Sequence, residues 1–90
     1  MLLSKDEVSK SVSSYGWSFE DKKLTKKFKF NTYMEGVEFV NKIAVISEKK
    51  NHHADIYLTW CEVEINISSH DMGGVTTKCV NLAMDISFLN

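Results

Sequence analysis

Apolar side chains recur along this chain at two periods, and each period predicts a different kind of element. Near the start, Ser4 and Glu7 have the spacing of a helix-capping box, and Gly16 can supply the left-handed residue that ends a helix. The apolar residues between them share one helical face: Val8, Val12 and Tyr15. A first helix is therefore expected between Ser4 and Gly16.

Two strands are predicted after this helix. Trp17 and Phe19 indicate a short strand, and the polar run 20–23 reads as a turn. The apolar residues of the next segment then alternate with polar ones: Leu24, Phe28 and Phe30. Such alternation is typical of a half-exposed antiparallel strand, although Lys26 falls on the apolar side of it.

A second, longer helix is predicted from about Thr32 to Lys50. Its apolar residues cover about half of the helical circumference: Tyr33, Val37, Phe39, Val40, Ile43, Ala44 and Ile46. A helix that rests on one sheet needs a stripe only about 100° wide. The extra width indicates either a helix well buried in its own domain or a contact with a second subunit.

The last third of the chain predicts two more strands and a helix. The strands are expected at Asp55–Trp60 and Cys61–His70, so that His70 would end the fourth strand on its polar face. Thr76 is placed to cap a third helix with this inner face: Cys79, Leu82, Ala83, Ile86 and Leu89. The order αββαββα, with two hairpins, predicts one two-layer α+β domain over residues 1–90.

Charge and cysteine content narrow the classes of function. The net charge of −1 gives no field that would attract nucleic acid or an anionic membrane, and we expect neither as a partner. A lysine-rich stretch at 22–29 is read as a solvated strand face. Two cysteines are too few for a disulfide scaffold, and no apolar run has the length of a signal peptide or a bilayer span. A cytoplasmic protein is expected.

Three histidines carry the candidate chemistry. His52 and His53 are adjacent, and His70 follows 17 residues later. Imidazole is the side chain that exchanges protons near neutral pH, so the three predict a proton-transfer site, with solvated loop residues as the alternative. A metal site built from them and a cysteine is not expected, because adjacent histidines diverge and no Cys-x₂-Cys or His-x₃-His pair is present.

The runs 48–53, 68–70 and 73–76, together with Trp60 and the Leu82-Ala83 pair, resemble the pterin-4a-carbinolamine dehydratase family. That family's pattern has an acidic residue, three positions and His-His-Pro, and later a Thr-His, a Gly-Gly-Leu-Thr turn and an Asp in the last helix. The resemblance covers the whole chain. It implies a four-stranded antiparallel sheet with three helices on one face, and dimers or tetramers with contacts through the second helix.

The resemblance also implies a reaction and the residues that serve it. The family removes water from 4a-hydroxytetrahydropterin to give quinonoid dihydropterin for tetrahydropterin recycling, as in tetrahydrobiopterin metabolism, without metal or organic cofactor. It implies three catalytic residues: His52, His53 and His70. It implies four supporting or substrate-binding residues: Glu48, Asn51, Ser68 and Ser69. Glu48 would orient an imidazole and raise its pKa, and the two serines would offer backbone hydrogen bonds to the pterin edge.

Two positions depart from the family's pattern. Ala54 replaces the proline after His-His, and Cys79 replaces the aspartate of the last helix. Because the histidines and Glu48 are kept, an active enzyme is expected, and Cys79→Asp should leave activity unchanged or raise it. The alternative readings are a protein-interaction module that uses the surface of the second helix, and a relative that acts in molybdopterin metabolism.

Overall fold

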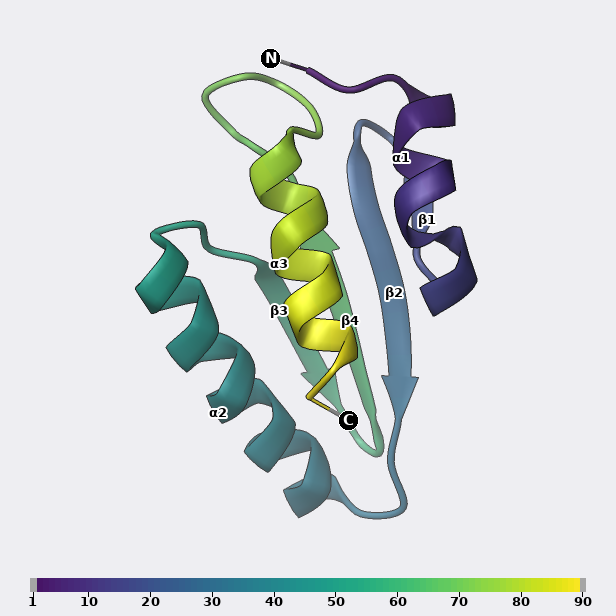
Figure 1. Ribbon diagram of the computed structural model, residues 1–90. Helices are drawn as coiled ribbons and strands as arrows, with labels where there is room; N and C mark the ends of the chain where they lie inside the picture. The colour runs from purple at the N-terminus through teal and green to yellow at the C-terminus, as the bar shows by residue number, and fades with distance from the viewer. Residues whose placement is uncertain (1, 90) are drawn as a thin grey trace.

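Four strands form one antiparallel sheet in the order β1-β2-β4-β3, and the computed structural model describes residues 2–89 (Figure 1). The strands are β1 Ser18–Glu20, β2 Lys23–Lys29, β3 Asp55–Thr59 and β4 Glu62–Ile67. The helices are α1 Lys5–Val12, α2 Tyr33–Lys50 and α3 Thr77–Ser87, and a 3₁₀ turn, η1 Ser13–Tyr15, follows α1. The predicted order αββαββα is confirmed.

The helices cover one face of the sheet, as the α+β prediction requires (Figure 1). Alternate residues of the central strands β2 and β4 point into this layer, because successive side chains of a strand face opposite ways. The fully or almost fully buried core consists of the following residues: Val8, Val12, Trp17, Leu24, Phe28, Phe39, Ile43, Val63, Ile65, Ile67, Val75, Cys79, Leu82, Ala83 and Ile86. None of the helices among residues 2–89 is long and apolar enough to cross a membrane.

Local signals at the first helix act as predicted. The Ser4 hydroxyl accepts the Glu7 backbone N–H at 3.2 Å, and the Glu7 carboxylate accepts the Ser4 N–H at 2.9 Å. Gly16 is left-handed, with φ of 86°. Lys26 falls on the apolar side of β2, where its amino group donates to the Tyr15 carbonyl and lies 4.6 Å from the centre of the Phe28 ring. Burial lowers the pKa of Lys26.

The second helix begins at Tyr33, with Thr32 as its N-cap, and buries a narrower face than its apolar arc predicts. Its buried residues are Gly36, Phe39, Ile43 and Ser47. Tyr33, Met34 and Val45 are exposed, at 46%, 63% and 56%. Apolar surface therefore remains on the outside of α2, but Phe39 and Ile43 belong to the core of the same chain.

The third and fourth strands are shorter than predicted, and the prediction that His70 ends a strand is wrong. Trp60 and Cys61 form the hairpin turn, where Cys61 has a φ of 62°. Strand β4 ends at Ile67 because the chain turns back at Ser69. The Ser69 N–H bonds to the Gly74 carbonyl at 2.7 Å, and the Ser69 carbonyl accepts the N–H groups of residues 72–74. His70 therefore lies in an exposed turn.

Candidate functional site

The three histidines meet at the end of the sheet where α2 ends, β4 ends and α3 begins (Figure 1). A cavity of about 330 Å³ at this end contains all three in its lining. The full lining is Asn51, His52, His53, Asp55, Ser68, Ser69, His70 and Asp71. Every predicted site residue except Glu48 therefore lines one cavity, and Glu48 contacts one of the histidines.

Asn51 sets the direction of the two adjacent imidazoles. It ends α2 in the left-handed conformation, with φ of 49°, which asparagine tolerates better than most residues. The backbone N–H of Asn51 bonds to the Glu48 carbonyl at 3.2 Å, and that of His52 bonds to the Ser47 carbonyl at 3.1 Å. Beyond this cap, His52 is partly buried and His53 is exposed.

His53 pairs with Glu48 on the surface. The His53 Nε2 atom lies 2.6 Å from Oε2 of Glu48, and the two side chains are 58% and 76% exposed. When His53 is protonated this contact is an ion pair, which contributes little to stability at such exposure. The contact brings Glu48 against an imidazole, and the orienting role expected of Glu48 stays a prediction.

His52 instead contacts the interior. Its Nε2 atom lies 3.2 Å from the sulfur of Cys79, which is fully buried. Burial is the main cause that lowers the pKa of His52; Lys78 lowers it further, and Asp71 opposes the shift. The lowered pKa favours the neutral form of His52, in which the imidazole has one donor and one acceptor nitrogen.

This depressed pKa predicts how stability depends on pH. Folding lowers the pKa of His52 from its ordinary 6.5, so below that pH the unfolded chain binds the proton more readily than the folded protein. The free energy of unfolding should therefore fall as the pH decreases through about 6.5. Urea denaturation between pH 5 and 8 measures this slope, and His52→Gln should make it shallower. An identical slope in both proteins would contradict the prediction.

The predicted serines occupy different positions. Ser68 is half-buried on the cavity wall, and Ser69 is buried with its backbone N–H already bonded to Gly74. The Ser69 hydroxyl lies 2.7 Å from that of Thr76, so Thr76 begins α3 without a side-chain cap bond. Ser69 thus joins the turn to the start of α3.

Sequence reasoning missed several residues around His52. A second cavity, of about 540 Å³, adjoins the first. Its lining is Asn51, His52, Ser69, Asp71, Met72, Thr76, Thr77 and Lys78. Among the missed residues, Asp71 could have been found from the sequence, because it follows His70 directly. Lys78 could not, because only the packing of α3 brings it to the site. Cavities of this size are typical of small-molecule sites.

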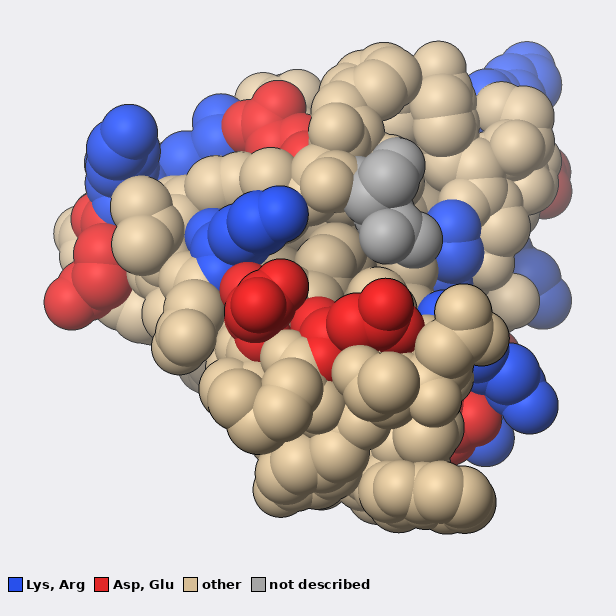
Figure 2. Space-filling model, turned by 90° about the horizontal axis from the view of Figure 1, so that it is seen from below, with Lys and Arg blue, Asp and Glu red and all other residues tan. Residues whose placement is uncertain are grey.

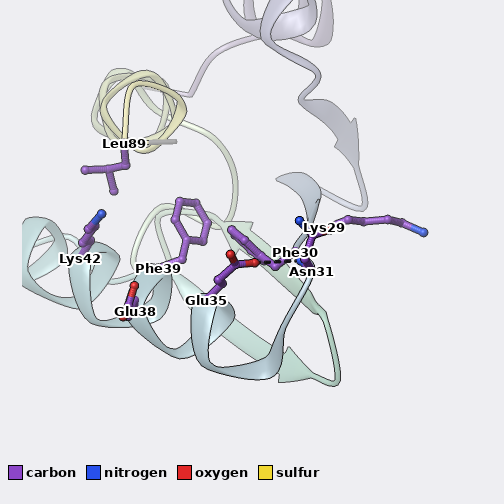
Figure 3. A pocket seen from close by; sticks show the side chains of 8 residues that line it. All are labelled: Lys29, Phe30, Asn31, Glu35, Glu38, Phe39, Lys42 and Leu89. Atoms are coloured by element: carbon purple, nitrogen blue, oxygen red, sulfur yellow. Dashed lines mark hydrogen bonds between the residues drawn. The ribbon is translucent and has the colours of Figure 1, made fainter.

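A third cavity lies at the opposite end of the molecule. It has about 350 Å³ and its lining is Lys29, Phe30, Asn31, Glu35, Glu38, Phe39, Lys42 and Leu89 (Figure 3). The Glu35 carboxylate serves the helix cap there, accepting the N–H groups of Asn31 and Thr32. Acidic and basic side chains lie close together on this end (Figure 2). Because its lining has no imidazole, it is a poorer candidate for proton transfer.

The side chains of residues 2–89 form no group of three or more His, Cys, Asp or Glu arranged to hold a metal ion. The candidate site contains imidazoles with carboxylate, hydroxyl and thiol neighbours. Groups of these kinds can donate and accept protons.

Known proteins resemble this chain over its whole length. Residues 1–89 match the family profile described as pterin 4 alpha carbinolamine dehydratase. A Sulfolobus acidocaldarius protein is 40% identical over 88 residues, which cover 97% of each chain. A Nostoc protein is 37% identical over 90 residues, covering 99% of this chain and 97% of its own. Both are named, provisionally, pterin-4-alpha-carbinolamine dehydratases.

Two solved structures share the fold. A transcriptional coactivator/pterin dehydratase from Brucella melitensis superposes with a TM-score of 0.91 at 23% identity, covering 99% of this chain and 98% of its own. A pterin dehydratase-like protein identified as a RuBisCO assembly factor in the alpha-carboxysome has a TM-score of 0.66 at 20% identity, covering 81% and 84%. At these identities the likeness extends to the fold alone. By its sequence, from the first helix to the last, the chain belongs to the pterin-4-alpha-carbinolamine dehydratase family.

Proposed function

We propose that this protein removes water from a 4a-hydroxytetrahydropterin and releases quinonoid dihydropterin for tetrahydropterin recycling, with no metal or organic cofactor. The observation that supports the proposal best is the set of three imidazoles around one cavity in a member of this family. The adjoining cavity of about 540 Å³ has room for a flat bicyclic ligand beside His52.

The chemistry needs two proton transfers. Hydroxide leaves C4a with the electrons of the C–O bond and departs as water only if it receives a proton. The ring loses a proton as the new double bond forms. A general acid and a general base on the two sides of the heterocycle meet both needs, and each typically contributes about 10²–10⁴ in rate. His52, His53 and His70 are the proposed groups, supported by Glu48 and Asn51.

An assay of the purified protein tests this proposal. With freshly generated 4a-hydroxytetrahydropterin, we expect dehydration well above the rate in buffer, and an unchanged rate after treatment with a chelator. The reason is that the site carries imidazoles for both proton transfers. A rate equal to that of buffer would overturn the enzyme proposal.

That negative result would favour the second candidate, a non-catalytic protein that binds a partner. Two observations support this candidate: Cys79 and Ala54 replace residues of the family's pattern, and one structural neighbour is an assembly factor. A related alternative is a dehydratase that acts on another pterin, such as one of molybdopterin metabolism. Dehydration rates with pterins that carry different side chains would distinguish these two dehydratase functions.

We expect the protein in the cytoplasm, where Cys61 and Cys79 stay free thiols.

We also propose that the protein assembles as a homodimer or homotetramer through α2. Met34 and Val45 are exposed on this helix and are available for such a contact. Phe39 and Ile43 are core residues, and a charge at Phe39 or Ile43 would unfold the chain.

Val45→Glu should therefore lower the mass measured by light scattering at micromolar concentration without unfolding the protein. Ser11→Glu, on the exposed side of α1, is the control. A monomeric wild type would contradict the proposed assembly.

A further inference from the structure

Four polar side chains form a chain of contacts behind the candidate site. The Thr76 hydroxyl lies 2.7 Å from that of Ser69, the Ser69 hydroxyl lies 3.4 Å from the Cys79 sulfur, and that sulfur lies 3.2 Å from Nε2 of His52. Cys79, Ser69 and Thr76 are 0%, 4% and 8% exposed. The Cys79 thiol is fully buried, so its hydrogen must find an acceptor within the chain, whereas Ser69 and Thr76 also line the larger cavity.

The distances to the possible acceptors favour one direction for this chain of hydrogen bonds. Each hydroxyl and the thiol has one hydrogen to donate. If Thr76 donates to Ser69, Ser69 to Cys79 and Cys79 to His52, every hydrogen has an acceptor at the shorter distances. In the opposite direction the Thr76 hydrogen has only the longer contact to the Cys79 sulfur, at 3.7 Å, or a partner inside the cavity. The first direction gives the fully buried thiol its nearest acceptor, Nε2 of His52 at 3.2 Å.

We propose that Cys79 is a positioning residue, which holds neutral His52 in the tautomer with its proton on Nδ1. Nε2 then accepts from the thiol, and Nδ1–H is the group that remains for a ligand. If the proposed dehydratase function holds, His52 meets the pterin as a hydrogen-bond donor, and the general base is His53 or His70.

The other groups around His52 act on its charge rather than on its tautomer. Lys78 on α3 and the neighbouring imidazoles of His53 and His70 disfavour a positive charge on His52, and Asp71 favours one. A carboxylate in place of the thiol would accept a hydrogen bond but donate none. It would draw the proton of His52 to Nε2 and favour the imidazolium through its negative charge.

Long-range ¹H–¹⁵N NMR correlations of histidine distinguish the two tautomers without any substrate. At a pH above the titration of His52, we expect the Nδ1–H tautomer in the wild type and in Cys79→Ser, whose hydroxyl can also donate. Cys79→Ala should lose this preference. Cys79→Asp should give the Nε2–H tautomer and an upward shift of the His52 titration midpoint. Amide spectra of each variant establish that it is folded, and Cys79→Ser serves as the near-isosteric variant if the others unfold.

Two results would overturn the proposal: a wild-type His52 with its proton on Nε2, or a tautomer ratio that folded Cys79→Ala leaves unchanged. Either result stands whether or not the protein dehydrates a pterin, so failure of this inference is distinct from failure of the proposed function. With an active protein, the kcat of Cys79→Ser should stay closer to the wild type than that of Cys79→Ala. The opposite order would also count against a positioning role.

Discussion

Replacing His52, His53 or His70 with alanine should each lower turnover by about 10–10⁴-fold, where the upper end is what the loss of a general acid or base can do. The three imidazoles line one cavity, and each has different neighbours: Cys79 for His52, Glu48 for His53 and the exposed turn for His70. Initial rates of dehydration at saturating pterin, corrected for the rate in buffer, measure the effect.

Two controls separate lost chemistry from lost structure. Lys10→Ala, on the exposed side of α1, should keep wild-type turnover. Glutamine at each histidine position keeps a polar side chain but cannot transfer a proton, so it should lose about as much activity as alanine. Thermal denaturation should be nearly unchanged for the variants of His53 and His70, because both are exposed. Wild-type turnover in all three folded alanine variants would contradict the assignment.

Elements set by local physics were predictable from the sequence. The capping box at Ser4 and the left-handed Gly16 act within a few residues of the chain, so their outcome depends little on the rest of the fold. At the end of α2, the contact between Glu48 and an imidazole was expected only from the family resemblance, and the left-handed conformation of Asn51 was not predicted.

Features set by long-range packing were predicted less well. We expected the alternation that reaches Ile67 to persist to His70, but the pairing of Ser69 with Gly74 turns the chain and places His70 in a turn. The wide apolar arc of α2 did not indicate which of its residues are buried in the core. The contact between His52 and Cys79 joins residues 27 apart, and no local spacing indicates it.

Leu82→Ala should lower the free energy of unfolding by about 2–5 kcal/mol, as large-to-small changes at fully buried leucines do. Leu82 is completely buried on the inner face of α3, where that helix packs against the sheet and against α2. A loss of this size is a large share of the 5–15 kcal/mol typical of small domains. Urea denaturation monitored by circular dichroism measures it.

Leu2→Ala is the matched control, because this leucine is 46% exposed and outside the core cluster. It should cost clearly less than Leu82→Ala. Since α3 carries Thr76 and Cys79 at its start, the weakened helix should also loosen the contact with His52, and amide exchange near residue 79 should quicken. Equal stability losses at positions 2 and 82 would mean that α3 does not depend on Leu82 for its attachment to the sheet.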